Sequence, residues 1–128
     1  MDIRAIKKKL IQLGRKKVRF IILFGSVAHK KNTPLSDIDI AVYYDGSAEE
    51  RFRFRMRASG ELSKVDLHIF QDLPLAVQKE VLSGKQLYFD DYQFMFDQYM
   101  NVIKEFSTFE KYYDEYLTEM RKVSHEST

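Results

Sequence analysis

Two aspartates separated by a single residue, Asp37 and Asp39, are the best candidates for chemistry in this sequence. They begin an apolar segment that continues through Ala41 and Val42, a pattern typical of a buried β-strand. Because side chains alternate across a strand, the two carboxylates share one face. Neighbouring carboxylates repel each other and lose hydration on a core strand, so the pair predicts a bound cation, and hard oxygen ligands favour Mg²⁺.

A glycine and a serine, Gly25 and Ser26, follow a second apolar run over residues 20–24. Gly25 permits a tight turn from a strand into a short helix, and Ser26 stands where that helix needs an N-cap. The free N–H groups of a helix N-terminus attract phosphate, and Lys30 could add a contact. Together with the aspartates, this turn predicts Mg-dependent transfer of a phosphoryl or nucleotidyl group.

The elements that must position these residues follow from the hydrophobic pattern. Apolar residues at helical spacing predict a first helix that ends at Gly14. The capping box from Ser47 to Glu50 predicts a further helix over 51–57, although that stretch alternates like a strand. The expected order is helix, strand, helix, strand, helix, strand, helix, short strand and helix. The strands are predicted over residues 20–24, 37–44, 64–70 and 86–89, and the later helices over 73–83 and from 91 onward.

A third carboxylate, Asp66, lies in the alternating segment 64–70. Val65, Leu67 and Ile69 share one face of this strand, which places Asp66 and His68 on the other. If the strand lies beside that of Asp39, Asp66 completes a cluster of three carboxylates. His68 is interpreted as a half-exposed strand residue.

The combination of Gly25, Ser26, Asp37 and Asp39 on two apolar strands resembles the signature of the polymerase-beta-like nucleotidyltransferases. The small size of the chain is similar to the minimal nucleotidyltransferase (MNT) branch. The resemblance implies an α/β fold with a mixed sheet of three or four strands, packed with helices. It also implies that Asp37, Asp39 and Asp66 are catalytic and hold two Mg²⁺ ions, while Gly25, Ser26 and Lys30 bind the phosphates of ATP.

Minimal members of this family are commonly encoded beside a HEPN-domain toxin. The resemblance therefore implies an antitoxin that transfers AMP from ATP to a tyrosine hydroxyl of the HEPN partner and releases pyrophosphate. Three alternatives remain open. They are a small-molecule nucleotidyltransferase of the aminoglycoside-modifying type, a non-catalytic binding antitoxin, and a transferase acting on nucleic-acid 3′ ends, against which the net charge of +2 argues.

The segment from residue 91 onward contains neither glycine nor proline and carries an apolar, aromatic stripe at steps of three and four. The stripe comprises Tyr92, Phe96, Tyr99, Ile103, Phe106, Phe109, Tyr113, Tyr116 and Met120. Either a capping box at residues 107–110 breaks the helix in two, or part of the stripe serves a partner or a second copy. We expect the first half to pack on the core.

The chain has 128 residues, which predicts a single domain with a nucleotidyltransferase core at 1–90 and a helical extension at 91–128. The absence of cysteine excludes disulfides and thiolate metal sites. Without an apolar run long enough for a membrane span or a signal peptide, the cytoplasm is the expected location.

Overall fold

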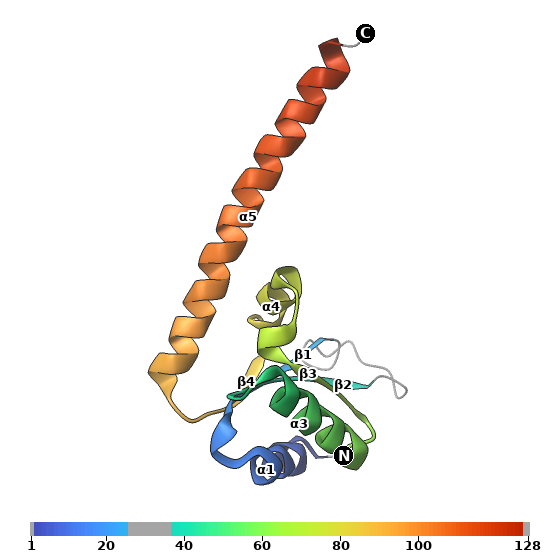
Figure 1. Cartoon of the computed structure of the whole chain (residues 1–128), viewed down its shortest axis with the longest axis vertical. Helices are drawn as coiled ribbons and strands as arrows, with labels where there is room; N and C mark the ends of the chain where they lie inside the picture. Colours follow the sequence, from blue (N-terminus) through green and yellow to red (C-terminus); the bar gives the residue numbers. More distant parts are fainter. Residues whose placement is uncertain (1, 26–36, 127–128) are drawn as a thin grey trace.

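The computed structural model describes residues 2–25 and 37–126, and within them the elements follow the predicted order. The short helix expected after Gly25 lies outside the described residues. Helices cover both faces of a single sheet (Figure 1). The elements are α1 (Ile3–Gly14), the 3-10 turn η1 (Arg15–Lys17), β1 (Val18–Phe24), β2 (Ile38–Tyr44), α3 (Ala48–Glu61), β3 (Val65–Ile69), the 3-10 turn η2 (Phe70–Asp72), α4 (Leu75–Val81), β4 (Lys85–Phe89) and α5 (Tyr92–Glu126).

The four strands form one mixed sheet in the order β3-β2-β1-β4. β1 is antiparallel to both of its neighbours, β2 and β4, while β2 and β3 run parallel. β1 is therefore a central strand, and all but one of its residues are buried. The predicted α/β fold with a three- to four-stranded mixed sheet is confirmed.

Two hydrophobic clusters cover the two faces of the sheet. On one face, Ile40 and Val42 pack with residues of α1 and α3. On the other face, Phe20 and Ala41 pack with residues of α4 and the first part of α5. Figure 1 shows α1 and α3 on one side of the sheet and α4 on the other. Since both faces are covered, a charged side chain can leave the sheet only near the end of a strand.

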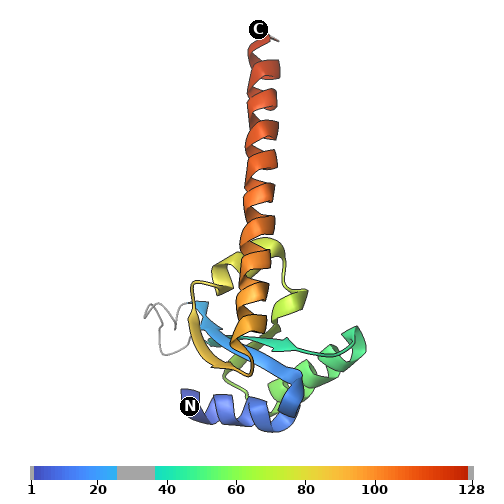
Figure 2. The same cartoon turned by 90° about the vertical axis from the view of Figure 1, so that its left-hand side faces the viewer.

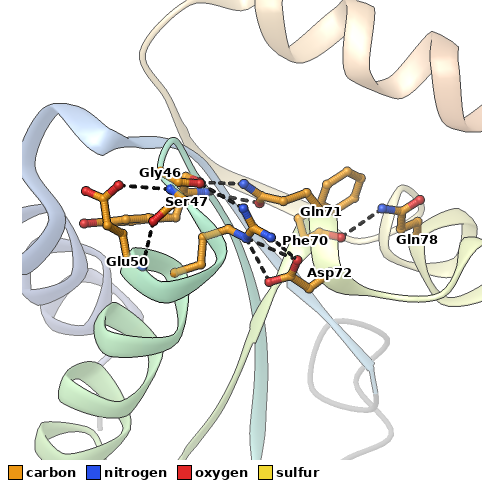
Figure 3. Close-up of polar contacts among 9 residues, drawn as sticks. Gly46, Ser47, Glu50, Phe70, Gln71, Asp72 and Gln78 are labelled. Atoms are coloured by element: carbon orange, nitrogen blue, oxygen red, sulfur yellow. Dashed lines mark hydrogen bonds and ion pairs between the residues drawn. The ribbon is translucent and has the colours of Figure 1, made fainter.

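The helix predicted after the Ser47 capping box is confirmed as α3. The Ser47 hydroxyl accepts from the Glu50 N–H, and the Glu50 carboxylate accepts from the Ser47 N–H (Figure 3). Within this helix Phe54 is buried, whereas Phe52 is 62% exposed. The cap fixes the first residue of α3 and therefore which residues face the sheet. Phe54 is turned inward, and its ring stacks on Tyr44.

One of the two alternatives for the C-terminal segment, a helix break at residues 107–110, is wrong. α5 is one helix of 35 residues, and the Thr108 hydroxyl donates to the Lys104 carbonyl within it instead of capping a new helix. Asp91 caps the beginning of α5 by accepting from the Gln93 and Phe94 N–H groups. Figure 2 shows α5 rising well clear of the sheet and its helices.

The face of α5 that packs on the core also differs from the expected stripe. Met95 and Val102 are the buried residues of α5, whereas Tyr92 and Phe96 are exposed. Of the predicted stripe, Tyr99 does join the cluster around Phe20. Among the described residues, no helix combines the length and the hydropathy needed to cross a membrane.

Candidate active site

The register of the sheet assembles the candidate site at one end of three adjacent strands. β2 and β3 pair so that Asp39 lies directly beside Asp66. β1 and β2 pair so that Phe24, the last residue of β1, lies opposite Asp39. Gly25 therefore follows at the same end of the sheet. Three segments that are distant in sequence meet here because hydrophobic alternation fixes which residues of each strand face the core.

Asp39, Asp66 and His68 form a compact cluster whose ligand atoms all lie within 4.8 Å of one another. The His68 Nε2 is 3.3 Å from the Asp66 Oδ2 and 3.7 Å from the Asp39 Oδ1. The ring of Phe24 packs against the imidazole, with 5.6 Å between the ring centroids. From the sequence, Asp66 was expected to approach Asp39 only if their strands were neighbours. The parallel pairing of β2 with β3 meets that condition.

The position of His68 was missed by the sequence analysis. Its interpretation as a half-exposed strand residue describes its burial, since its side chain is 24% exposed, but not its contacts. The signal was present in the alternation, because His68 shares a face with Asp66 two residues earlier. Strand order decides whether that face meets another carboxylate, and the residue pattern alone does not contain that order.

The pKa of Asp39 reflects its burial and its charged neighbours. Burial raises the pKa of the Asp39 carboxyl, and the neighbouring Asp66 charge raises it further, while His68 acts in the opposite direction. The side chain of Asp39 is 29% exposed and that of Asp66 is 50% exposed. Within the cluster, His68 therefore compensates the negative charge of the two carboxylates only in part.

This donor set fits a divalent cation. Two facing carboxylates provide hard oxygen ligands. A cation between them would offset both the burial and the Asp66 charge that raise the pKa of Asp39. The imidazole of His68 is a ligand better suited to transition metals than to Mg²⁺. For Mg²⁺, therefore, Asp39 and Asp66 are the fitting ligands, and His68 is a neighbour that contacts both.

Gly25 is required by the geometry at this position. Its φ is +78°, a left-handed conformation that other residues rarely adopt. A Cβ at this residue would lie 2.3 Å from the Asp39 Oδ2, with the Asp39 side chain filling the space. The glycine thus lets the chain turn at the end of β1 while it passes directly against the carboxylate.

The sequence predicted three further site residues, Ser26, Lys30 and Asp37. Ser26 and Lys30 lie outside the described residues. Asp37 directly precedes β2 and is exposed. Within residues 2–25 and 37–126, the group of potential metal ligands around Asp39 does not include Asp37. Metal binding by Asp37 therefore stays a prediction.

A pocket of about 440 Å³ adjoins the cluster on the β3 side. His68 is part of its wall, and α3 contributes Arg51, Phe52 and Arg55. Arg51 is held by two donors to the Asp72 carboxylate, at 2.8 and 3.0 Å, and by a third to the Gly46 carbonyl (Figure 3). The pocket thus combines an exposed aromatic ring with cationic side chains, beside a carboxylate pair.

The segment that supports this pocket is fixed by side-chain amides. Gln71 exchanges hydrogen bonds with the backbone of Tyr44, and the Gln78 amide donates to the Phe70 carbonyl at 3.0 Å (Figure 3). These bonds tie η2 to the end of β2 and to α4. The Asp72 carboxylate is consequently presented to Arg51 from a turn that is anchored on both sides.

Comparison with known families decides which class of protein this fold represents. Residues 5–93 match the family model described as polymerase beta, nucleotidyltransferase. The chain belongs to the polymerase-beta nucleotidyltransferase family. The matched span includes Gly25, Asp37, Asp39 and Asp66, so the nucleotidyltransferase domain contains the whole candidate site. The family prediction is confirmed.

Solved structures share the fold of this nucleotidyltransferase along almost its entire length. A toxin–antitoxin crystal structure with AMP-PNP aligns at a TM-score of 0.73 and 22% identity, covering 93% of this chain and 98% of the other. The MntA-HepT toxin–antitoxin structure aligns at 0.66 and 22%, covering 93% and 98%. None of the curated proteins matches the chain.

A third structure is the tri-AMPylated HEPN toxin of Shewanella oneidensis in complex with its MNT antitoxin. It aligns at a TM-score of 0.66 and 22% identity, covering 91% of this nucleotidyltransferase and 97% of that chain. At this identity the likeness establishes the fold. It includes α5, because the aligned share of this chain extends well beyond the family domain.

Proposed function

We propose that this nucleotidyltransferase is a Mg²⁺-dependent protein adenylyltransferase that modifies a HEPN-domain partner and thereby acts as its antitoxin. It would transfer AMP from ATP to a tyrosine hydroxyl of the partner and release pyrophosphate. The observation that carries the proposal is the pairing of Asp39 with Asp66 beside the tight turn at Gly25. The fold shared with antitoxins of MNT–HEPN pairs supports the choice of acceptor.

The proposed division of labour follows from the positions of the residues. Asp39 and Asp66 would hold magnesium, with Asp37 as a further ligand at the end of β2. When bound, the metal supplies positive charge that neutralises the triphosphate and stabilises the transferring group. Gly25 lets the backbone approach the phosphates, and we assign phosphate contacts to Ser26 and Lys30. Two Mg²⁺ ions match this number of carboxylates.

The reaction requires the acceptor oxygen to attack the α-phosphorus. A new P–O bond forms, the bond to the bridging oxygen of the β-phosphate breaks, and pyrophosphate leaves with its electron pair. The hydroxyl proton must be taken up nearby, and Asp66, half exposed and 3.3 Å from the His68 Nε2, is suitably placed. Positioning and charge supply the rate in this class of transfer.

The acceptor can reach the carboxylates through the pocket between α3 and β3. Gly25 and β1 flank Asp39 on one side, whereas His68 and the pocket lie on the other. We therefore place the nucleotide on the Gly25 side and the acceptor tyrosine on the α3 side. Phe52 offers a surface for a phenol ring, and Arg55 offers positive charge for the developing phenolate.

Intact mass spectrometry of the partner tests this function. The proposed HEPN-domain partner is incubated with ATP, Mg²⁺ and the nucleotidyltransferase. We expect one or more AMP additions with the unmodified chain. Asp39→Asn and Asp66→Asn should each slow the transfer by about a thousandfold, whereas Asp114→Asn, on the exposed part of α5, should have no effect. Asp37→Asn tests the carboxylate that stands apart from the cluster.

Two outcomes would contradict the proposal. If the partner gains no mass yet is bound and silenced, the chain is a binding antitoxin. If AMP appears on a free small hydroxyl compound in preference to the protein, the chain is a small-molecule transferase. Calorimetry of AMP-PNP binding, with and without Mg²⁺, shows why Asp39→Asn fails. If Mg²⁺ no longer strengthens AMP-PNP binding, the variant has lost the metal site and not the acceptor.

A further inference from the structure

The exposed part of α5 continues a seam that the domain itself uses for packing. Met95, Tyr99 and Val102 face the core of the domain and follow one another at steps of four and three. The same alternation continues without a break through the rest of the helix. Its members beyond Val102 are Phe106, Phe109, Tyr113, Tyr116, Met120 and Val123. In heptad terms these residues occupy the a and d positions throughout.

The seam is covered in its first part and uncovered in its second. Met95 and Val102 are almost fully buried, at 1% and 5% exposure, whereas the five members from Phe109 to Val123 are each 52–59% exposed. At 1.5 Å per residue, the helix extends about 36 Å beyond Val102. An apolar stripe of this length exceeds the scattered exposed residues that are normal for a monomer.

The charges beside the uncovered seam decide between occupants. Positions e and g of the heptads carry Glu105, Glu110 and Glu119 as their charged residues between Val102 and Val123. In a pair of identical helices, parallel or antiparallel, these positions would bring glutamates opposite glutamates. Like charges across an interface disfavour association, so a second copy is a poor occupant.

We propose that the α5 seam, residues Phe106–Val123, is the docking surface for a helix of the acceptor protein that presents an apolar ridge flanked by lysine or arginine. A heptad stripe is complementary to another helix, because its a and d side chains fit between those of a facing helix. The acidic e and g positions then select a basic flank. The identity of the partner rests on the proposed function, but the surface and its chemistry do not.

Docking at this seam also separates binding from catalysis. The seam begins at the outer end of the α4–α5 packing, where the Lys79 ammonium lies 5.8 Å from the Phe106 ring centroid. The carboxylate cluster lies at the end of β1, β2 and β3. An acceptor bound to α5 would be tethered to the domain. Tethering raises the effective concentration of its tyrosine hydroxyl at the α3 pocket.

Binding to the proposed HEPN-domain partner, measured by calorimetry, tests the proposal with two matched pairs of variants. The first pair compares Phe109→Ala/Tyr116→Ala on the seam with Lys111→Ala/Thr118→Ala on the opposite face. The second compares Glu110→Lys/Glu119→Lys beside the seam with Asp114→Lys/Glu115→Lys away from it. Both charge variants change the net charge equally. All replaced side chains are exposed, so helical content should be unchanged.

We expect the seam variant to weaken binding at least about thirtyfold and the adjacent charge reversal about tenfold or more, with both controls within about threefold. Equal binding by the seam variant and its control would overturn the proposal, as would failure of the unmodified chain to bind the HEPN-domain protein. A tight homodimer in sedimentation analysis that the seam variant dissolves would assign the surface to a second copy instead. If binding follows the expected pattern but no AMP is transferred, the docking surface stands and the adenylyltransferase function fails.

Discussion

The two halves of α5 carry the same side-chain pattern and meet opposite environments. Residues 92–102 place Met95 and Val102 against the sheet, while the stretch from Phe109 to Val123 exposes side chains of the same kind. Helical periodicity therefore predicts an apolar face but not what covers it. The first half is held by tertiary packing, and the second half depends on intrinsic helix propensity until something covers it.

The largest expected effect comes from removing a buried side chain of the first half. Met95→Ala should lower the free energy of unfolding by about 2–4 kcal/mol, because it leaves a cavity between α5 and the sheet. Tyr116→Ala in the second half should change it by less than about 0.5 kcal/mol. Urea denaturation measures both. Equal losses in the two variants would show that the second half is covered within the chain.

Shortening the chain gives a smaller effect. A chain that ends after Ser107 keeps Met95, Tyr99 and Val102 against the sheet, so the domain should remain folded, with stability lowered by about 1 kcal/mol or less. The urea m-value should stay nearly constant, because the removed residues bury little surface. A clear fall in m would mean that the second half contributes to the cooperative unit.

The dependence of stability on acidic pH tests an ion pair that lies outside α5. Glu50 pairs with Lys17, and the pKa of Glu50 is lowered to about 2, chiefly by the hydrogen bond from Lys17. A lowered pKa contributes stability that is present above the ordinary value of 4.5 and is lost as the pH falls toward 2. Glu50→Gln should flatten this dependence between pH 4.5 and 2.

Partner affinity at neutral pH serves as the control for Glu50→Gln. The ion pair joins η1 to α3, and neither element contains a residue of the α5 seam. Binding should therefore be unchanged in this variant. A weakened complex would indicate that the partner contacts Lys17 or Glu50 in addition to the α3 pocket, whose lining includes neither residue.

The smallest effect is expected at Tyr99, inside the covered half. Its hydroxyl is buried, and no described atom forms a hydrogen bond of good geometry with it. Burial raises the pKa of this phenol, and the nearby Gln86 side chain acts weakly in the opposite direction. Tyr99→Phe removes a desolvated polar group and should leave stability unchanged or raise it by up to about 1 kcal/mol. Thermal unfolding can resolve this change. A loss of stability would reveal that the hydroxyl is bonded in solution.

Much of this architecture could be predicted from local pattern. The α/β order, the Ser47 capping box and the strands that carry Asp39 and Asp66 all follow from alternation and cap chemistry, which act within a few residues. The family signature rests on Gly25, Ser26, Asp37 and Asp39. Even the positive φ of Gly25 agrees with the tight turn expected there.

What could not be predicted depends on contacts between distant segments. The role of His68 needs the parallel pairing of β2 with β3. The buried face of α3 depends on where Tyr44 lies, and the Phe54 ring turns inward to stack on it while Phe52 stays exposed. The capping-box sequence at residues 107–110 does not break the helix, because the Thr108 hydroxyl can bond to a carbonyl within the helix.

The guanidinium of Arg55 has a consequence for the behaviour of the protein at high concentration. β3 is the outermost strand on its side of the sheet, and the Arg55 Nε donates to the Leu67 carbonyl there at 3.0 Å. An open strand edge is a template on which another chain can add a strand and begin to aggregate. By occupying one of those acceptors with a charged side chain, Arg55 protects the edge against such growth during expression and storage.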